Sequence, residues 1–352
     1  MVYSDLRRYM MKRKKMIYWI VAVFVIVGFG AWSAASAQPV ELNFNLFIHA
    51  QHDRYVACHK PWIEKLEKAS GGKLKITPYF SNSLTPMPEK FNSTVAGIAD
   101  ISEGLVFVNP GRFPMSELLM LPELGLETAE KAGEAWWHLF KTMPAMQKEY
   151  AGVKMLFLHA SPKMMIATRK KPVRKIEDLK GLKIWTTGKT PVRTAKALGF
   201  TPVAMAPGEV YLALDKGVID GCFADFEILV ARRFYEVTKY ITTNLYMNHT
   251  PFYVIMNQGV WDGLPQDIRK VFEQYSGDWA VKFYGEIRDE EERHNEKVAA
   301  EKGMQLIQLP AAEVAKAKRI VEPVKADYAA ELEGKGLPGK KALAELQKFA
   351  IK

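Results

Sequence analysis

The sequence predicts an α/β protein whose parallel sheets open a ligand crevice at the carboxyl ends of their strands. Residues 177–221 alternate short apolar strands with short helices, and residues 40–80 contain a strand, a helix and a strand. Such βαβ alternation builds parallel sheets. The chain has 352 residues, enough for two domains, yet no low-complexity linker divides it. Two lobes built from discontinuous segments would account for the missing linker.

Residues 183–221 are predicted to form a βαβαβ unit. Lys183–Trp185 follows a glycine turn and ends in two apolar residues, one β-branched and one aromatic. Residues of these kinds are typical of strands. Thr190 and Pro191 indicate a helix start, since a hydroxyl N-cap followed by proline is a common opening, and Gly199 closes that helix. The next strand, helix and strand are expected at 201–205, 207–217 and 218–221.

The loop after the first strand is a candidate ligand-binding loop. Residues 40–48 alternate apolar and polar side chains, as a half-buried strand does, before a helix expected at 55–69 and a strand at 73–80. This unit places His49, His52, Asp53 and Arg54 at the carboxyl end of its first strand. His49 and His52 are therefore candidate ligand contacts, with a loop or helix-capping role as the alternative for each.

A second candidate element follows a short strand predicted at 98–101. The turn Ser102–Gly104 comes directly after it, so Glu103 is expected to reach the crevice. There Glu103 would meet a donor group of the ligand, or it would face solvent. Further helices are expected at 91–97, 129–140 and 265–301, and further strands at 153–159, 164–168 and 246–256.

The first 37 residues have the features of a cleavable signal peptide. Lys12–Lys15 form a basic region, residues 16–31 are a nearly uninterrupted apolar run without charges, and Ala35-Ser36-Ala37 fits a small-x-small cleavage site. The alternative is an uncleaved membrane anchor, but the run is shorter than the roughly 20 apolar residues that a spanning helix prefers. We therefore expect export to the periplasm, with Gln38 as the first mature residue.

The net charge of +10 is concentrated in this predicted signal. Residues 1–15 hold six basic residues and one acidic residue, so about half of the charge would leave with the signal. The remaining charge is spread along the chain without the basic cluster of a nucleic-acid-binding surface. Cys58 and Cys222 are the two cysteines, and a disulfide between them stays open because sequence alone gives no Cα separation.

Motifs of common catalytic and metal sites are missing from the sequence. It contains no HExxH, CxxC or GxSxG, so zinc protease, thioredoxin-like and α/β-hydrolase functions have no support. Gly188-Lys189-Thr190 resembles the end of a P-loop, but the earlier glycine that the motif requires falls at Lys183. The seven histidines do not cluster at metal-ligand spacing. The sequence therefore predicts no enzyme, no cofactor and no metal.

Four motifs carry a family resemblance: DLKGLKI, ALGFTPVAM, GEVYLAL and KGVIDG. In this order and spacing they resemble the solute-binding protein of a TRAP (tripartite ATP-independent periplasmic) transporter. PGRFP, KKPV and YEVTKY extend the resemblance over almost the whole mature chain. The resemblance implies a two-lobed periplasmic-binding-protein fold with discontinuous domains and a ligand cleft between them. Lobe I would hold residues 38–161 plus 250–288, and lobe II residues 162–249 plus 289–352.

The resemblance also implies a function and partners. The protein would capture a small molecule and deliver it to the integral membrane subunits of a TRAP transporter, without performing chemistry. A periplasmic sensor that reports the ligand to a membrane receptor would use the same fold and is the alternative.

The chain departs from this family at the usual carboxylate clamp. Family members usually carry an arginine at the end of the KIR strand, where its guanidinium grips a substrate carboxylate through two hydrogen bonds. In this sequence that position is Trp185. A second family arginine falls at Met164 or Met165, and an assisting asparagine falls near Ala224, beside Phe223. Aromatic and thioether groups thus occupy the place of the clamp.

Two hypotheses about the ligand follow from this departure. In the first, the ligand has no carboxylate at this point, and Trp185, Met165 and Phe223 form an apolar or cation–π wall. An amine of the ligand would then pair with an acidic side chain, for which the candidates are Glu103, Asp225 and Glu227.

In the second hypothesis the ligand is still an anion and is held elsewhere. Thr186, Thr187 and Gly188 lead into a helix whose free N–H groups favour negative charge. Basic side chains that would assist are Arg54, Lys189 and Arg193. The alternative for Trp185 is a core position without ligand contact.

Overall fold

The structure is a computed structural model that describes residues 38–351. The signal peptide expected at residues 1–37 lies outside the described residues. The chain divides into two compact units, Met1–Val40 and Glu41–Lys352, and the second unit contains the elements described below. Among the described helices, none combines the length and the apolar character that a membrane crossing requires.

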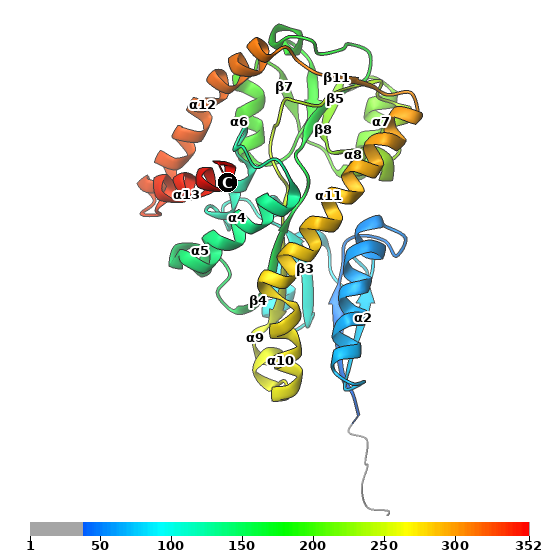
Figure 1. Ribbon diagram of the computed structural model, residues 1–352, viewed down its shortest axis with the longest axis vertical. Helices are drawn as coiled ribbons and strands as arrows, with labels where there is room; N and C mark the ends of the chain where they lie inside the picture. Colours follow the sequence, from blue (N-terminus) through cyan, green and yellow to red (C-terminus); the bar gives the residue numbers. More distant parts are fainter. Residues whose placement is uncertain (1–37, 352) are drawn as a thin grey trace, which may run out of the picture. The chain divides into compact units, whose positions relative to one another are not determined.

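The first sheet has five strands in the order β2-β1-β3-β10-β4, of which β3 and β4 are labelled in Figure 1. β1 and β3 are parallel, whereas β10 runs antiparallel to both β3 and β4. The strands are β1 (Val40–Asn45), β2 (Leu74–Tyr79), β3 (Ile101–Leu105), β4 (Val153–Ala160) and β10 (Pro251–Asn257).

The second sheet has six strands in the order β11-β9-β5-β8-β6-β7. β6 is parallel to β7 and to β8, which confirms the parallel arrangement predicted for residues 183–221. β5 is antiparallel to β8 and to β9. The strands are β5 (Met165–Thr168), β6 (Lys183–Trp185), β7 (Thr201–Val203), β8 (Gly221–Ala224), β9 (Tyr240–Thr242) and β11 (Gln305–Ile307).

The two sheets share one arrangement. In each, the first strand of the parallel unit lies between the second and the third, and the neighbour beyond the third strand is antiparallel. In the first sheet this neighbour returns from a distant part of the chain, whereas in the second sheet it directly precedes the parallel unit. In the first sheet that antiparallel neighbour is β10, and in the second sheet it is β5. The chain therefore passes between the sheets more than once, as the missing linker indicated.

Two adjacent backbone segments connect the sheets. The Ser161 N–H donates to the Thr250 carbonyl at 2.9 Å, and the Met164 N–H donates to the Asn248 carbonyl at 2.7 Å. The strand predicted at 246–256 is accordingly shorter, since only Pro251–Asn257 belongs to a ladder and Asn248 forms an isolated bridge with Met164. This paired crossing keeps the two sheet regions connected at one place.

The helix α11 (Gly277–Glu301) packs against elements of both sheet regions (Figure 1). It contacts α4 (Ala129–Thr142) and β4, and also α8 (Phe226–Ala231). Its Asp289 carboxylate accepts the Ala129 N–H at 2.7 Å, and its Glu292 carboxylate accepts the Phe226 N–H at 3.0 Å. Carboxylates suit helix N-termini, so α11 fixes the start of one helix from each region.

The other helices cover the sheets and the chain ends. Short 3₁₀ segments lie at Met87–Glu89, Val106–Val108, Ser116–Met120, Ile176–Leu179, Pro207–Glu209 and Phe234–Glu236, and Tyr55–His59 is a π-helical turn. The α-helices are α2 (Lys60–Ala69), α3 (Lys90–Val95), α5 (Pro144–Glu149), α6 (Lys189–Ala197), α7 (Val210–Asp215), α9 (Gln258–Gly263), α10 (Gln266–Tyr275), α12 (Ala311–Gly334) and α13 (Gly339–Ile351).

The third strand of each sheet begins later than the sequence indicated. Residues 98–100 and 218–220, which were predicted as strand, lie outside the ladders, which start at Ile101 and Gly221. In both places an aspartate precedes the ladder and its carboxylate accepts a backbone N–H of the first strand: Asp100 from Asn43 and Asp220 from Lys183, each at 2.8 Å. These aspartates hold neighbouring strands together instead of ending a strand.

The start of α6 also differs from the prediction. Its N-cap is Gly188, at φ +91°, and not Thr190. The Thr190 hydroxyl is buried and donates to the Met120 carbonyl at 3.1 Å, so it is not free to cap. A Cβ at position 188 would lie 2.9 Å from the Met120 side chain, so both the backbone angle and the space favour glycine here.

Candidate ligand-binding site

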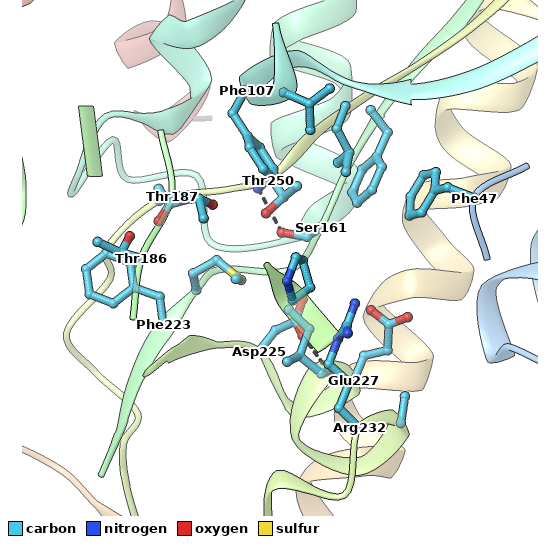
Figure 2. A pocket seen from close by; sticks show the side chains of 18 of the residues that line it. Phe47, Phe107, Ser161, Thr186, Thr187, Phe223, Asp225, Glu227, Arg232 and Thr250 are labelled. Atoms are coloured by element: carbon cyan, nitrogen blue, oxygen red, sulfur yellow. Dashed lines mark hydrogen bonds between the residues drawn. The ribbon is translucent and has the colours of Figure 1, made fainter. Parts of the chain in front are cut away.

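A cavity lies between the two sheet regions, at the carboxyl ends of β1, β6 and β8 (Figure 2). Its volume is about 170 Å³. An engineered apolar cavity of about 150 Å³ accommodates benzene, so this one has room for a solute of about one ring. Its aromatic lining residues are Phe47, Phe107, Trp185, Phe223 and Phe252, and its charged or titratable ones are His52, Arg54, Asp225, Glu227 and Arg232.

Aromatic rings form part of the cavity wall, together with aliphatic and methionine side chains such as Leu105, Met120 and Met164. Figure 2 shows Phe47, Phe107 and Phe223 on different sides, with Asp225, Glu227 and Arg232 together at one end. The Phe47 and Phe252 rings are stacked with centroids 6.4 Å apart. The wall therefore favours a solute that is apolar over much of its surface.

Trp185 is the last residue of β6, at the edge of the cavity. It is 7% exposed, and its indole N–H donates to the Met205 carbonyl at 3.1 Å. The only polar atom of the side chain is thus already paired within the second sheet region. What remains for the cavity is the apolar ring.

Arg54 lines the cavity with a buried guanidinium. Its side chain is 4% exposed, and its Nε faces Glu103 Oε1 at 3.3 Å. The guanidinium carbon lies 4.3 Å from the Phe252 ring centroid and 5.0 Å from that of Phe47. Within residues 38–351, its two terminal nitrogens donate no hydrogen bond. Arg54 is therefore held firmly and keeps spare donors.

Glu103 is the centre of a buried group that we call the Glu103 cluster, together with Arg54, His59 and His159. Its Oε1 lies 3.0 Å from His59 Nε2 and 3.1 Å from His159 Nε2, besides the Arg54 contact. Burial alone would raise the pKa of Glu103, but Arg54 and the two histidines outweigh it and hold that pKa well below its usual value. Glu103 is therefore an anion in the folded protein.

The histidines of the Glu103 cluster are buried with it. Burial lowers the pKa of His159 to about 4 despite the contact with Glu103, so His159 is neutral near pH 7. His59 Nδ1 lies 2.8 Å from the hydroxyl of Tyr284, a residue of α11. His59 thus connects the Glu103 cluster to the helix that packs against both regions.

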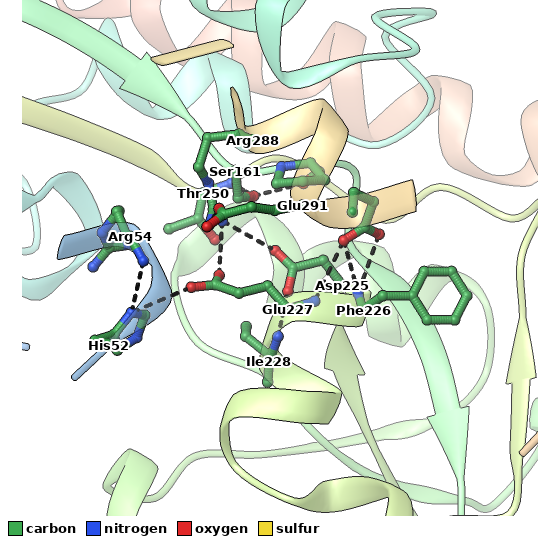
Figure 3. A network of polar contacts seen from close by, with 12 residues as sticks. His52, Arg54, Ser161, Asp225, Phe226, Glu227, Ile228, Thr250, Arg288 and Glu291 are labelled. Atoms are coloured by element: carbon green, nitrogen blue, oxygen red, sulfur yellow. Dashed lines mark hydrogen bonds and ion pairs between the residues drawn. The ribbon is translucent and has the colours of Figure 1, made fainter. Parts of the chain in front are cut away.

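A second buried group, the Arg288 cluster, consists of Arg288, Asp225, Glu227 and Glu291 (Figure 3). Arg288 of α11 donates from Nη2 to Glu227 at 2.7 Å and from Nη1 to Glu291 at 3.1 Å. The Asp225 carboxylate lies 3.9 Å from Nη2. Arg288 is fully buried, so this single cation balances several carboxylates out of water.

The carboxylates of the Arg288 cluster have very different acidities. Burial and the neighbouring Glu227 charge raise the pKa of Asp225 to about 7. Burial acts in the same direction on Glu227, but Arg288 outweighs it and lowers that pKa to about 2. The pKa of Glu291 is raised, again chiefly by burial. One arginine thus keeps one carboxylate fully ionised and leaves the others with raised pKa values.

His52 lies between the two clusters (Figure 3). Its Nδ1 accepts the Arg54 backbone N–H at 3.2 Å and lies 3.6 Å from Glu227 Oε1. Burial, with Arg54 as the next cause, lowers the pKa of His52 to about 3, so the imidazole is neutral near pH 7. The 3.6 Å approach is therefore not an ion pair at neutral pH.

Arg232 is the other arginine of the cavity lining, at the end of α8. It is exposed, and within the described part of the chain it makes no hydrogen bond or ion pair. The two carboxylates of the lining, Asp225 and Glu227, both have cationic neighbours. Within residues 38–351, the spare donors of the charged end are on its arginines, and its spare acceptors are Asp225 Oδ2 and Glu227 Oε1, which are buried without a hydrogen bond.

The geometry places a largely apolar cavity with charged groups at one end between two similar sheets. The family model DctP, described as bacterial extracellular solute-binding protein family 7, matches residues 46–332. The chain belongs to this family. The fold is the two-lobed α/β fold of the TRAP solute-binding proteins, as the sequence motifs indicated.

Solved structures and curated relatives agree with this assignment. The crystal structure of a TRAP solute-binding protein from Rhodoferax ferrireducens T118 with copurified benzoate has a TM-score of 0.83 and 25% identity, covering 89% of this chain and 98% of that one. A TRAP periplasmic solute-binding protein from Bordetella bronchiseptica with bound mandelate has a TM-score of 0.81 and 25% identity, covering 89% and 99%. The C4-dicarboxylate-binding periplasmic protein DctP of Rhodobacter capsulatus is 25% identical over 314 residues, 88% of this chain and 92% of that protein.

The family assignment settles the broad function. The protein is a periplasmic solute-binding protein that captures a small molecule for a TRAP-type transporter. Family members are solute receptors and not enzymes, and they work with TRAP membrane subunits. Among residues 38–351, no group of three or more His, Cys, Asp or Glu side chains is arranged to hold a metal ion. Both cysteines, Cys58 and Cys222, are buried and free.

Five of the eight residues predicted to contact the ligand line the cavity: Trp185, Phe223, His52, Thr187 and Asp225. Ligand contact by each remains a prediction. Of the basic residues considered for an anion, Arg54 lines the cavity, whereas Lys189 and Arg193 form ion pairs with Glu331 of α12 and do not line it.

The other three predicted residues lie outside the cavity lining. His49 is exposed and packs beside His52, with ring centroids 5.5 Å apart. Met165 sits on the opposite face of β5 from Met164, which does line the cavity, because successive strand residues point to opposite faces. Glu103 lies within β3 and not in a turn after it, so its carboxylate is buried among Arg54, His59 and His159.

Several lining residues were not predicted from the sequence, among them Phe47, Phe107, Phe252 and Arg232. Phe47 and Phe107 each follow shortly after a strand that ends at the cavity, so an aromatic residue at a strand's carboxyl end was an available signal. Phe252 and Arg232 had no such signal, because the first comes from the crossing strand and the second from the end of a short helix.

Proposed function

We propose that this protein captures a small anionic solute with one aromatic ring and delivers it to the integral subunits of a TRAP transporter. One observation carries the proposal: within residues 38–351, the terminal nitrogens of the lining arginines Arg54 and Arg232 donate no hydrogen bond. A carboxylate on the ligand would supply acceptors for these donors.

Arg288 balances the charge of the acidic side chains in the lining, which disfavours an amine even though one oxygen of each carboxylate has no hydrogen bond. Glu227 accepts from Arg288 at 2.7 Å, and Asp225 is turned toward the same guanidinium at 3.9 Å. The Asp225 carboxylate also accepts the Ile228 N–H at 2.8 Å, as the N-cap of α8. Arg54 and Arg232 have no such partner for their terminal nitrogens. A carboxylate on the ligand matches these donors in charge and geometry.

The rest of the cavity favours an aromatic ring. Phe47, Phe107, Phe223, Phe252 and the ring of Trp185 surround a volume of about 170 Å³. Rings of this kind bind another ring by offset stacking or edge-to-face contact. The solved relatives described with benzoate and mandelate, both ring-bearing carboxylates, support the same class.

Capture would occur by closure of two lobes, without a reaction. We assign residues 38–161 plus 250–288 to lobe I and 162–249 plus 289–352 to lobe II, with the paired crossing at Ser161–Met164 as the hinge. The Ser161 hydroxyl in the lining donates to the Pro162 carbonyl at 2.6 Å and accepts the Thr250 N–H at 2.9 Å. With both contacts to backbone, it has no base that would make it a nucleophile.

A thermal-shift screen of the exported protein tests this proposal. The panel holds benzoate, 3-hydroxybenzoate and mandelate, with benzylamine, benzamide and succinate as comparisons. A ligand of the folded state at 100 times its Kd stabilises by about 2.7 kcal/mol, which raises the melting temperature by several degrees. We expect that rise with the aromatic carboxylates. Stabilisation by benzylamine, with none by any carboxylate, would favour the amine hypothesis and overturn this proposal.

A further inference from the structure

Arg54 combines three properties that are rarely found together on one side chain. It is 3% exposed, it lines the ligand cavity, and its terminal nitrogens donate to no other group within residues 38–351. The family's usual arginine at the end of the KIR strand is replaced here by Trp185, whose indole N–H is already bonded to Met205. The cavity therefore needs another group to hold an anion.

We propose that Arg54 is the residue that binds the carboxylate of the ligand, and that Glu103 is its positioning residue. This inference rests on the proposed function, because it assumes an anionic ligand. The ligand's carboxylate would then be bound by the loop after β1, in the first sheet region, and not by the end of β6 in the second sheet region.

The Arg54 guanidinium is orientated before any ligand arrives. Its Nε faces Glu103 at 3.3 Å, and the Phe252 and Phe47 rings lie 4.3 and 5.0 Å from its central carbon. Because the Nε is directed at Glu103, the edge formed by the two terminal nitrogens stays available. That edge can donate two parallel hydrogen bonds to one carboxylate.

Arg232 is less suited to this task. It is exposed and its guanidinium has no contact that holds it, so binding would cost the rotamer freedom of a long side chain. Arg54 has already lost that freedom on folding. Arg232 contributes mainly by attracting the anion toward the cavity.

Glu103 holds Arg54 through a single oxygen. His59, His159 and Arg54 all approach Oε1, and Oε2 is buried without a hydrogen bond. The histidine contacts fix the carboxylate from the side away from the cavity, and the carboxylate in turn fixes Arg54. An amide in its place would still offer an oxygen to Arg54 Nε, whereas a methyl group would not.

The test is a calorimetric titration with benzoate and with the neutral isostere benzamide. The reference protein is Glu103→Gln, and it is compared with the double variant Glu103→Gln/Arg54→Met. Removing both charged side chains in the double variant avoids leaving Glu103 as an unpaired buried charge. Loss of a charged hydrogen-bonded contact should weaken benzoate binding roughly 10- to 100-fold. Benzamide affinity should change by less than about threefold, showing that the cavity is intact.

Three further variants sharpen the assignment. Arg232→Met should weaken benzoate binding less than the Arg54 change does. Arg112→Met is a matched control, because Arg112 also lies over an aromatic ring, Phe91 at 3.7 Å, but outside the cavity lining, so affinity should stay at the wild-type value. Glu103→Ala should weaken benzoate and spare benzamide, while Glu103→Gln should bind benzoate about as tightly as the wild type.

The outcomes separate this inference from the proposed function. Benzoate affinity that is equal with and without Arg54 would overturn the inference and leave the proposed function standing. A larger loss with Arg232→Met would do the same. Wild-type protein that binds no aromatic carboxylate at all would overturn both. Unchanged benzoate affinity in Glu103→Ala would remove the positioning role of Glu103.

Discussion

The two buried charge clusters beside the cavity are opposite in composition. In the Glu103 cluster one carboxylate is approached by an arginine and two histidines, all at 3.0 to 3.3 Å. In the Arg288 cluster one arginine is approached by three carboxylates, at 2.7 to 3.9 Å. Both are almost free of solvent, so each ion depends on its neighbours instead of water.

This difference explains why the clusters offer different chemistry to the cavity. An excess of donors around Glu103 leaves Arg54 with N–H groups to spare. The carboxylates around Arg288 leave only its Nε without a hydrogen bond, and burial together with the Glu227 charge raises the pKa of Asp225 to about 7. The first cluster is suited to holding an anion, while the second makes stability sensitive to pH near neutrality.

The largest expected effect comes from removing the only cation of the Arg288 cluster. Arg288→Met would leave the Glu227 and Asp225 carboxylates buried without a counter-ion. Breaking a buried ion pair on one side costs about 3–5 kcal/mol of unfolding free energy. Urea denaturation followed by tryptophan fluorescence measures this loss.

A surface pair on the same helix provides the control for that experiment. Lys282 and Glu286 lie 3.7 Å apart on α11 with both side chains more than half exposed. Lys282→Met should change the unfolding free energy by less than about 1 kcal/mol. Equal effects of the two substitutions would show that the Arg288 cluster is not energetically special.

A smaller effect, with a defined pH dependence, is expected at Asp225. A carboxyl whose pKa rises from 3.8 unfolded to about 7 folded holds a proton in the native state that the unfolded state releases. Stability therefore falls as pH rises between about 4 and 7. Asp225→Asn removes this slope and keeps an N-cap oxygen for α8, so the variant should gain about 1–2 kcal/mol over wild type at pH 7.

Melting temperatures of both proteins from pH 4.5 to 7.5 check this prediction. The advantage of Asp225→Asn should grow steadily with pH. Asp327→Asn, exposed on α12, is the control and should change stability little at any pH. An advantage that is constant across the range would contradict an elevated Asp225 pKa.

The smallest effect is expected at His52, where the two clusters approach each other. Its pKa falls from 6.5 unfolded to about 3 folded, so the unfolded state binds the extra proton between these values. This contribution makes wild-type stability rise with pH from about 3 to 6.5, the opposite sign to Asp225. His52→Asn should therefore be more stable than wild type by about 1 kcal/mol near pH 5, with no gain at pH 7.5.

Guanidinium denaturation at these two pH values measures the difference. Combining His52→Asn with Asp225→Asn should flatten the pH profile on both sides. A gain from His52→Asn that is larger at pH 7.5 than at pH 5 would mean that the imidazole is charged in the folded protein.

Several features of the fold followed from local sequence. The βαβαβ order of residues 183–221, the strand ending at Trp185 and the turn at Gly199 all depend on short-range preferences for strands, caps and positive φ angles. The position of Trp185 beside the cavity also followed, because the carboxyl ends of parallel strands meet at one edge of a sheet. Such rules need only neighbouring residues.

The tertiary structure determines which charged side chains contact one another. Glu103 was expected in an exposed turn because the preceding Ile98 to Ile101 looked like the strand. Its partners come from two segments, Arg54 and His59 from the turn after β1 and His159 from β4, and only the pairing of β1, β3, β10 and β4 brings them to one carboxylate. A buried glutamate is stable only with such partners, and no local pattern reveals them.

The tertiary structure also determines which face of a strand lines the cavity and which segments close the cavity. A shift of one residue exchanges Met164 for Met165 at the cavity, because side chains alternate between faces. Phe252 reaches Arg54 and Phe47 only because the crossing strand β10 returns beside β3. The sequence by itself determined the family and the order of elements. The tertiary structure decided which arginine faces the cavity, since that depends on distant segments packing together.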